Sequence, residues 1–191
     1  MKKVIWIFGE SATGKKTLIE NLLNDNSSIK NELNLQNKKI QVLKLTIEET
    51  NESFDDKNSE MIRNNGILNE VENFTKSDLD VLLIKGQAND MDNRYGNTLR
   101  TFAERFPQLE KEILLLEVED LDLLYNRIIN KSWFKEDEER YSKMFPRSWI
   151  DKAVVKHRKK VESYKDLGFE IIDIESTNDF IIKEKGIINN G

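Results

Sequence analysis

A chain of 191 residues is long enough to bury a core around a central sheet but leaves little room for a second full domain. It contains no cysteine, which excludes disulfides and thiolate zinc sites and favours a reducing compartment, so we expect a cytoplasmic protein. Its formal net charge of −5 argues against a surface that is coated by nucleic acid throughout, although one local basic patch would be compatible with it.

The first elements are expected to be a strand and a helix. Residues 4–8 form a continuous apolar run rich in β-branched and aromatic side chains, which is typical of a strand buried on both faces of a parallel sheet. The run stops at Gly9 and Glu10, too early for a signal peptide or a membrane span, so we expect no membrane contact. Residues 17–23 place leucine and isoleucine at helical spacing and predict an amphipathic helix. Residues 40–47 alternate apolar and polar side chains and predict a strand nearer the edge of the sheet.

The rest of the chain continues to alternate strand and helix patterns. Residues 50–65 are polar, and we expect a mobile connection with a short helix there. Residues 80–84 form another apolar run and predict a central strand that ends at Lys85. Further strands are expected at 112–118 and 169–174, and helices at 98–106, 121–128 and across most of 131–163. This order predicts a single α/β domain over residues 1–191, a three-layer parallel sheet flanked by helices with right-handed crossovers.

A phosphate-binding motif lies between the first strand and the first helix. It reads Gly9-Glu10-Ser11-Ala12-Thr13-Gly14-Lys15 and fits the Walker A pattern up to its lysine, in the required strand–loop–helix context. The glycines let backbone N–H groups wrap a phosphate, the helix dipole adds positive potential, and Lys15 reaches the β- and γ-phosphates. The segment from Gly9 to Thr17 is therefore expected to bind ATP.

The motif departs from the standard pattern at one position. Lys16 stands where a serine or threonine usually binds Mg²⁺, and the hydroxyl follows one residue later at Thr17. We expect Thr17 to face the magnesium ion, and Lys16 to be a solvated residue within the same nucleotide-binding segment. Ser11 and Thr13 are less suitable magnesium ligands because they precede the helix.

Other classes of P-loop protein fit the chain less well. A GTPase needs an Asn-Lys-x-Asp motif that binds guanine, and the nearest candidate, residues 130–133, has Trp133 in place of the aspartate. Leu83 also stands where a switch motif ahead of Gly86 would need an aspartate. Motor ATPases are longer and have a hydrophobic strand that ends in acidic residues, whereas the central strand expected here ends in Lys85.

The Gly-Lys-x-Thr arrangement at residues 14–17 and the order of elements over roughly residues 3–175 resemble the adenylate-kinase-like nucleoside and nucleotide kinases. Residues 86–94, which begin Gly-Gln-Ala-Asn-Asp and end in arginine, are similar to the Asp-Gly-x-x-Arg region that holds the acceptor in that family. The resemblance implies Mg²⁺-ATP as the phosphate donor and a lid over about residues 127–150. It implies acceptor contacts from Arg63, Lys85, Gln87, Asp90 and Arg94, and contacts with the transferring phosphoryl group from Lys15, Arg127, Arg140 and Arg147.

Two departures bear on the chemistry that the resemblance implies. Lys85 stands where the family usually has an aspartate that orders the magnesium shell. Either Asp90, Asp92 or Glu48 takes over that role, or Lys85 contacts phosphate, or the protein binds nucleotide without turning it over. Glu48 is also our candidate base for a hydroxyl acceptor, because it follows the second strand on the same rim as the loop. The alternative is that Glu48 and Glu49 are simply acidic residues at a strand exit.

The acceptor itself stays open, and charge is the feature that bears on it. Residues 140–160 carry eight Lys and Arg residues against the single acid Asp151. Four lysines recur at helical spacing and would share one face, along which DNA could lie: Lys152, Lys156, Lys159 and Lys160. His157, among these cations, is expected at the surface.

Three functions are compatible with these patterns. We favour a kinase that moves the γ-phosphate of ATP to a nucleoside, nucleotide or similar small acceptor. The alternatives are a kinase that acts on DNA through the basic stretch, and a nucleotide-binding switch protein without catalysis. The sequence contains no motif that identifies the acceptor or the oligomeric state.

Overall fold

The computed structural model describes residues 1–43, 57–86, 92–93 and 96–183, without the side chains of 57–63, 92–93 and 96–97. Its main feature is a six-stranded sheet in the order β2-β3-β1-β6-β7-β8. The first five of these are mutually parallel, and β8 pairs antiparallel with β7. Their bounds are β2 Ile40–Leu43, β3 Val81–Lys85, β1 Lys3–Gly9, β6 Glu110–Glu117, β7 Glu170–Glu175 and β8 Ile181–Ile182.

This arrangement confirms an α/β fold with a mostly parallel sheet. The strands expected at 4–8, 80–84, 112–118 and 169–174 are β1, β3, β6 and β7, and the one expected near the edge is the edge strand β2. β8 was not foreseen, because an antiparallel strand of two residues has too little pattern to recognise. A separate antiparallel pair joins β4 (Asp92–Asn93) to β5 (Gly96–Asn97).

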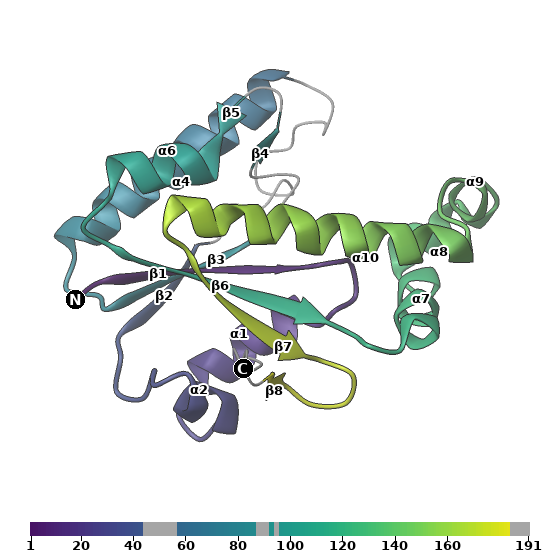
Figure 1. The fold of residues 1–191 in the computed structure, drawn as a ribbon, viewed down its shortest axis with the longest axis horizontal. Helices are drawn as coiled ribbons and strands as arrows, with labels where there is room; N and C mark the ends of the chain where they lie inside the picture. The colour runs from purple at the N-terminus through teal and green to yellow at the C-terminus, as the bar shows by residue number, and fades with distance from the viewer. Residues whose placement is uncertain (44–56, 87–91, 94–95, 184–191) are drawn as a thin grey trace, which may run out of the picture.

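Helices cover both faces of the sheet (Figure 1). One face carries α4, α6 and α10, and the other carries α1 and α2. Two more short elements link α10 to its neighbours: α9 precedes it, and the 3₁₀ helix η1 follows it. Their bounds are α1 Lys15–Leu23, α2 Ser28–Glu32, α4 Lys57–Lys76, α6 Thr98–Arg105, α9 Glu138–Met144, α10 Arg147–Glu162 and η1 Ser163–Leu167.

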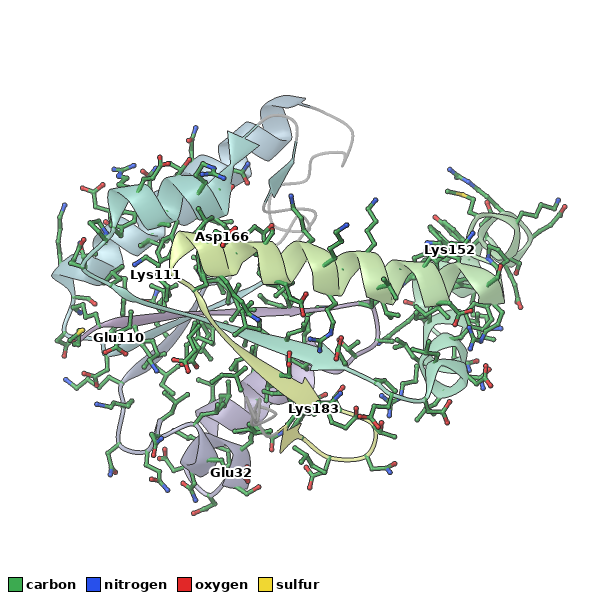
Figure 2. The ribbon with its side chains drawn as sticks, in the orientation of Figure 1. Glu32, Glu110, Lys111, Lys152, Asp166 and Lys183 are labelled. Carbon is green, nitrogen blue, oxygen red and sulfur yellow. The ribbon has the colours of Figure 1, made fainter. Side chains whose placement is uncertain are left out.

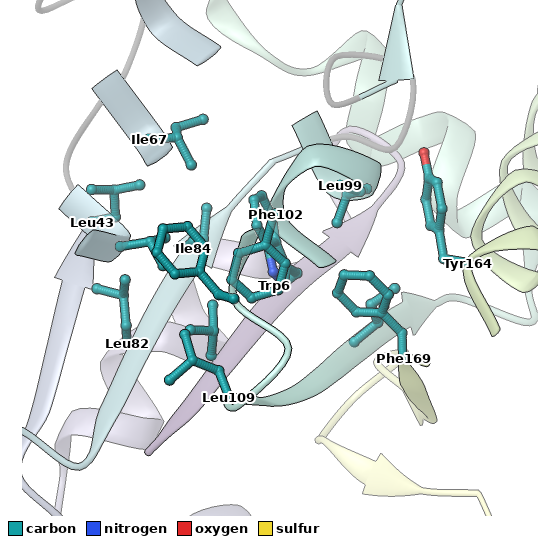
Figure 3. Close-up of a cluster of buried hydrophobic side chains, with 14 of the residues drawn as sticks. Trp6, Leu43, Ile67, Leu82, Ile84, Leu99, Phe102, Leu109, Tyr164 and Phe169 are labelled. Atoms are coloured by element: carbon teal, nitrogen blue, oxygen red, sulfur yellow. The ribbon is translucent and has the colours of Figure 1, made fainter. Parts of the chain in front are cut away.

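The strand β1 is the centre of both layers of the core. All of residues 4–8 are fully buried, because successive side chains of this interior strand point to opposite faces and both faces are covered. Trp6 points into the layer beneath α4 and α6, where its ring meets that of Phe102 edge-on, with the ring centroids 5.5 Å apart (Figure 3). Ile5 and Ile7 pack on the α1 side.

Over residues 50–65 we expected a mobile connection with a short helix, and the structure has a helix in the second half of that range that is much longer than expected. The helix α4 begins at Lys57 and runs for 20 residues. Its later part buries Ile67, Val71 and Phe74, which recur at the spacing of one helical face. The polar first half of the helix hid this pattern. Residues 50–56 lie outside the described residues.

A group of short helices lies beyond the carboxyl end of β6 and forms a core of its own. It consists of α7 (Leu121–Ile129), α8 (Ser132–Glu136), α9 and the first turn of α10, and we call it the helical block. Its buried residues are Val118, Leu124, Ile128, Phe134 and Ile150. The largely helical character expected for residues 131–163 is therefore confirmed.

One buried charge pair lies at the amino end of the sheet. Glu112 of β6 is 4% exposed, and its Oε2 accepts a hydrogen bond of 2.9 Å from Nζ of Lys3. Its other carboxylate oxygen has no hydrogen-bond partner among the described residues. Burial raises the pKa of Glu112, against the opposing effect of the Lys3 ammonium.

Candidate functional site

The loop at residues 10–14 joins β1 to α1 and lies at the topological switch point of the sheet, where neighbouring strands have connections that run to opposite sides. β1 is flanked by β3 on one side and β6 on the other. The chain leaves β1 through α1 towards β2, and leaves β6 through the helical block towards β7, so the two connections run to opposite sides. In open parallel sheets such a switch point, at the carboxyl ends of the strands, is where ligands bind.

Gly9 brings this loop close to the backbone of β6. It pairs with Leu116 in the parallel ladder. A Cβ atom placed on Gly9 would lie 2.8 Å from the carbonyl oxygen of Leu116 and 2.5 Å from Oγ1 of Thr13. Any side chain would therefore force the strand and the loop apart, and only glycine permits this close approach.

The loop ends at a helix terminus that has no cap. Gly14 is the N-cap residue of α1, with left-handed φ 91° and ψ 19°, and a glycine has no side chain that could cap the first amides. The first turn of α1 also contains no acidic residue. Ala12, at φ 64°, is left-handed as well. Left-handed residues turn successive N–H groups towards one side, and an uncapped helix start adds positive potential, so this segment is suited to an anion.

Lys15 folds back over the loop. Its Nζ donates hydrogen bonds to the carbonyl oxygens of Gly9 and Glu10, at 2.5 and 2.8 Å. The ammonium is therefore held on the loop by backbone acceptors of the motif itself. Lys16 and Thr17 are exposed on the first turn of α1, as expected for a solvated lysine.

Ser176, directly after β7, fastens the loop to two strands. Its hydroxyl lies 2.7 Å from the carbonyl oxygen of Thr13, to which it donates a hydrogen bond, and 3.1 Å from that of Glu117. Its N–H also donates to the Glu117 carbonyl oxygen, at 2.8 Å. The sequence reasoning missed this residue. The signal available was its position after a parallel strand, which places it on the same rim as the loop.

Arg127 of α7 supports the segment that carries Ser176. Its guanidinium donates to the carbonyl oxygens of Ser176, at 3.1 Å, and of Thr177. A few residues on, the ring of Phe180 lies against the loop, 3.5 Å from where a Cβ of Gly14 would be. In this structure Arg127 thus holds backbone beside the loop.

His157 is not at the surface as expected, but 5% exposed and in contact with the loop. Its Nδ1 lies 3.2 Å from Oε1 of Glu10. The lysines and arginine around it in the sequence concealed its position, whereas its spacing from Ile150 and Val161 places it on the buried face of α10. Glu10, Thr13 and His157 are among the residues that line a cavity of about 170 Å³ beside the loop.

The end of β3 brings Lys85 to the same rim. Lys85 pairs with Ile7 in the ladder and is exposed, and the N–H of Gly86 donates to the Ile7 carbonyl oxygen at 3.2 Å. Lys85 makes no ion pair within the described part of the chain. Several expected site residues lie outside the described residues: Glu48, Gln87, Asp90 and Arg94 entirely, and Arg63 and Asp92 in their side chains.

The helical block carries the arginines expected in the lid. Five aromatic rings pack in sequence through it: Trp133, Phe134, Tyr141, Phe145 and Trp149. Arg140 is exposed, with its guanidinium 5.7 Å from the ring centroid of Tyr141. Arg147 donates hydrogen bonds to Asp122 and Asp151, at 2.6 and 3.0 Å, which raise its pKa.

The cations of α10 differ in what they contact. Arg158 donates to both carboxylate oxygens of Glu117 and also to Asp173, and these bonds raise its pKa. Three lysines on the outward face are exposed and make no ion pair among the described residues: Lys152, Lys156 and Lys159. Lys152 lies near the end of α10 that adjoins the helical block (Figure 2). Lys160 is half-buried, with its ammonium 5.9 Å from the Tyr164 ring centroid.

Two kinds of feature are absent from the described residues. No three or more His, Cys, Asp and Glu side chains there are grouped as they would be to hold a metal ion. None of the helices there combines the length and the apolar character needed to span a bilayer.

No family model matches the chain, and no curated protein matches it either.

Proposed function

We propose that this protein is an ATP-dependent phosphotransferase, a P-loop kinase that moves the γ-phosphate of ATP to a nucleoside, nucleotide or similar small acceptor. The observation that carries the proposal is the loop between β1 and α1. It combines a glycine pressed against the backbone of Leu116, an uncapped helix start and a lysine folded over the loop. Each of these favours a polyphosphate, and together they lie at the switch point of the sheet.

The residues of the loop fit ATP and magnesium in their chemistry. The N–H groups of the loop and of the first turn of α1 would hold the phosphates, and Lys15 would exchange its carbonyl contacts for phosphate oxygens. Thr17, exposed on the first turn, would supply the hydroxyl on the magnesium side. A bound magnesium ion would neutralise charge on the phosphates.

In the proposed reaction the acceptor oxygen bonds to the terminal phosphorus while the bond to the bridging oxygen breaks and ADP leaves; a hydroxyl acceptor would also give its proton to a base, for which Glu48 is the candidate from the sequence. Catalysis of such a transfer depends on positioning and charge neutralisation, which cations near the loop would supply. Lys85, on the same rim as the loop, suits this role because it is exposed and makes no ion pair among the described residues. Arg140 of the helical block is likewise exposed and makes no ion pair there, and it would have to approach the loop to act. Arg127 suits it less, because its guanidinium is occupied by two carbonyl oxygens. A reducing, cytoplasmic location belongs to the same proposal, because the chain has no cysteine.

The test uses two neighbouring lysines. Lys15→Ala should abolish binding of Mg²⁺-ATP, measured by calorimetry, because the ammonium that would meet the β- and γ-phosphates is removed. Lys16→Ala is the matched control, since this exposed lysine projects into solvent from the next position of α1. Equal affinity in both variants and the unchanged protein would contradict the proposal. Transfer of labelled phosphate from ATP to panels of nucleosides, nucleotides and short DNA would then identify the acceptor, and ATP binding without transfer to any of them would favour the non-catalytic switch.

A second candidate, a kinase that acts on DNA, is favoured by the outward face of α10. Most of the arginines in the basic stretch are engaged by carboxylates, but Lys152, Lys156 and Lys159 are exposed without such partners among the described residues. They span about 10 Å along the helix, enough to follow several phosphates of a strand.

Salt dependence separates the two acceptors. If DNA is the acceptor, its affinity should fall steeply with salt, because each lysine that meets a phosphate releases counterions. Replacing all three lysines by glutamine should flatten that slope while ATP affinity is unchanged. Absence of DNA binding at low salt would exclude this candidate.

A further inference from the structure

The carbonyl oxygen of Glu10 accepts three hydrogen bonds within the phosphate-binding loop. It accepts a hydrogen bond of 2.8 Å from Nζ of Lys15 and another of 2.9 Å from the hydroxyl of Thr13. The N–H of Thr13 also points to this oxygen, at 3.4 Å. A change in the orientation of the Glu10 peptide would therefore move both the lysine and the turn.

The side chain of Glu10 points away from these contacts and meets α10. Its Oε1 lies 3.2 Å from Nδ1 of His157, and its side chain is only 15% exposed. A carboxylate with so little access to water needs a partner, because its charge loses most of its hydration. His157 is that partner. A hydrogen donated from Nδ1 would fix the direction of the Glu10 side chain.

His157 is itself held firmly. It is 5% exposed, lies on the buried face of α10 with Ile150 and Val161, and its ring meets that of Phe8 with the centroids 6.4 Å apart. Its Nε2 is buried and has no hydrogen-bond partner among the described residues. The imidazole therefore makes one polar contact in this part of the structure, and that contact is with the loop.

We propose that His157 is a positioning residue of the phosphate-binding loop. Through the Glu10 carboxylate it fixes the peptide whose carbonyl oxygen holds Lys15, and so keeps the loop in the form that receives phosphate. It touches neither the nucleotide nor the acceptor in this role. The inference deepens the proposed function and rests on it only where the ligand is concerned, since the effect on the loop is present without ATP.

Two substitutions at His157 separate positioning from packing. His157→Phe keeps an aromatic ring against Phe8 and removes the donor, whereas His157→Asn places an amide nitrogen near the position of Nδ1 and restores it. Glu10→Ala removes the other partner of the same contact, so the positioning role can still be tested if His157→Phe does not fold. Val155→Ala is the control on the same helix, because this side chain is 66% exposed.

The first measurement needs no ligand. Hydrogen exchange of the amides at residues 10–18 should accelerate about tenfold in His157→Phe and Glu10→Ala, the loss expected for one hydrogen bond to a charged group. Exchange in β1 and β6 should be unchanged, and His157→Asn and Val155→Ala should behave like the unchanged protein. Equal exchange in all of these proteins, or equal acceleration throughout the sheet, would overturn the positioning role.

The second measurement is the affinity for Mg²⁺-ATP by calorimetry. It should fall about tenfold in His157→Phe and recover in His157→Asn, whereas a purely structural role would lower the melting temperature and leave affinity in the folded protein unchanged. If the unchanged protein does not bind ATP, the proposed function fails, and the exchange measurement still decides the role of His157. If it binds ATP and His157→Phe binds it equally well, the positioning role fails alone.

Discussion

Substitution of Gly9 by alanine should damage the protein through a contact that can be measured in the structure. The added Cβ would lie 2.8 Å from the carbonyl oxygen of Leu116 and 2.5 Å from Oγ1 of Thr13. The threonine hydroxyl can rotate, but only by giving up its hydrogen bond to the Glu10 carbonyl oxygen, at a cost of about 1 kcal/mol. The Leu116 carbonyl belongs to the backbone of β6 and cannot turn aside, so β1 must shift, as in overpacked cores that lose about 1–3 kcal/mol.

These terms sum to about 2–4 kcal/mol of unfolding free energy for Gly9→Ala. In a domain of this size each kcal/mol lowers the melting temperature by about 2–4 °C. Urea denaturation gives the free energy, and calorimetry gives the affinity for Mg²⁺-ATP, which should also fall because the loop is displaced.

Gly168→Ala is the matched control for this substitution. Gly168 has left-handed φ +84°, but a Cβ there would have no atom within 4 Å, so this variant carries backbone strain of about 1–2 kcal/mol without a clash. It should leave ATP affinity unchanged. If Gly9→Ala were no less stable than Gly168→Ala and bound ATP normally, the argument from close approach would be refuted.

Two further predictions follow from contacts at the two ends of the sheet. In the first, Arg127→Ala should lower the unfolding free energy by about 1–3 kcal/mol in thermal melts, because the carbonyl oxygens of Ser176 and Thr177 lose a charged donor. A fall in kcat with unchanged stability would show instead that Arg127 acts on the transferring phosphoryl group. In the second, Glu112→Gln should remove the part of the pH dependence in which the unfolding free energy falls as pH rises. The native pKa of Glu112 is raised, so the unfolded chain releases this proton first, and stability should fall as pH rises from the unfolded pKa to the native one and stay lower above it. The melting temperatures of Glu112→Gln and of the unchanged protein should be measured between pH 3 and pH 8. Two parallel curves would contradict the prediction.

The strands could be predicted from the sequence because burial on both faces leaves a continuous apolar run. Residues 4–8 and 80–84 show this run, and both strands lie in the interior of the sheet. The helix α4 shows the opposite case. Its first half is polar and carries no periodic pattern, and its buried residues from Ile67 onward lie beyond the segment in which a short helix was expected.

The site was only partly accessible to sequence reasoning, because its motif is local and its supports are not. The loop from Gly9 to Lys15 is contiguous and could be recognised as a pattern. Ser176 reaches the loop from more than 100 residues away, and Arg127 supports Ser176 from yet another segment; such contacts depend on how parallel strands align.

The position of His157 was wrongly predicted for another reason. Its neighbours in sequence are cations, whereas it shares the buried face of α10 with Ile150 and Val161. In space it meets Glu10 and Phe8.

The loop is therefore held from two directions by the same part of the fold. Arg127, on α7, supports the segment whose Ser176 hydroxyl bonds to Thr13, and α10 provides the histidine that meets Glu10. Ala12, between those two loop residues, packs against the apolar core of the helical block. Because α7 belongs to that block and α10 begins in it, a displacement of the block relative to β1 must either break these contacts or move the loop with it. The helical block that carries Arg140 on α9 is thus linked through α7 and α10 to the loop that carries Lys15.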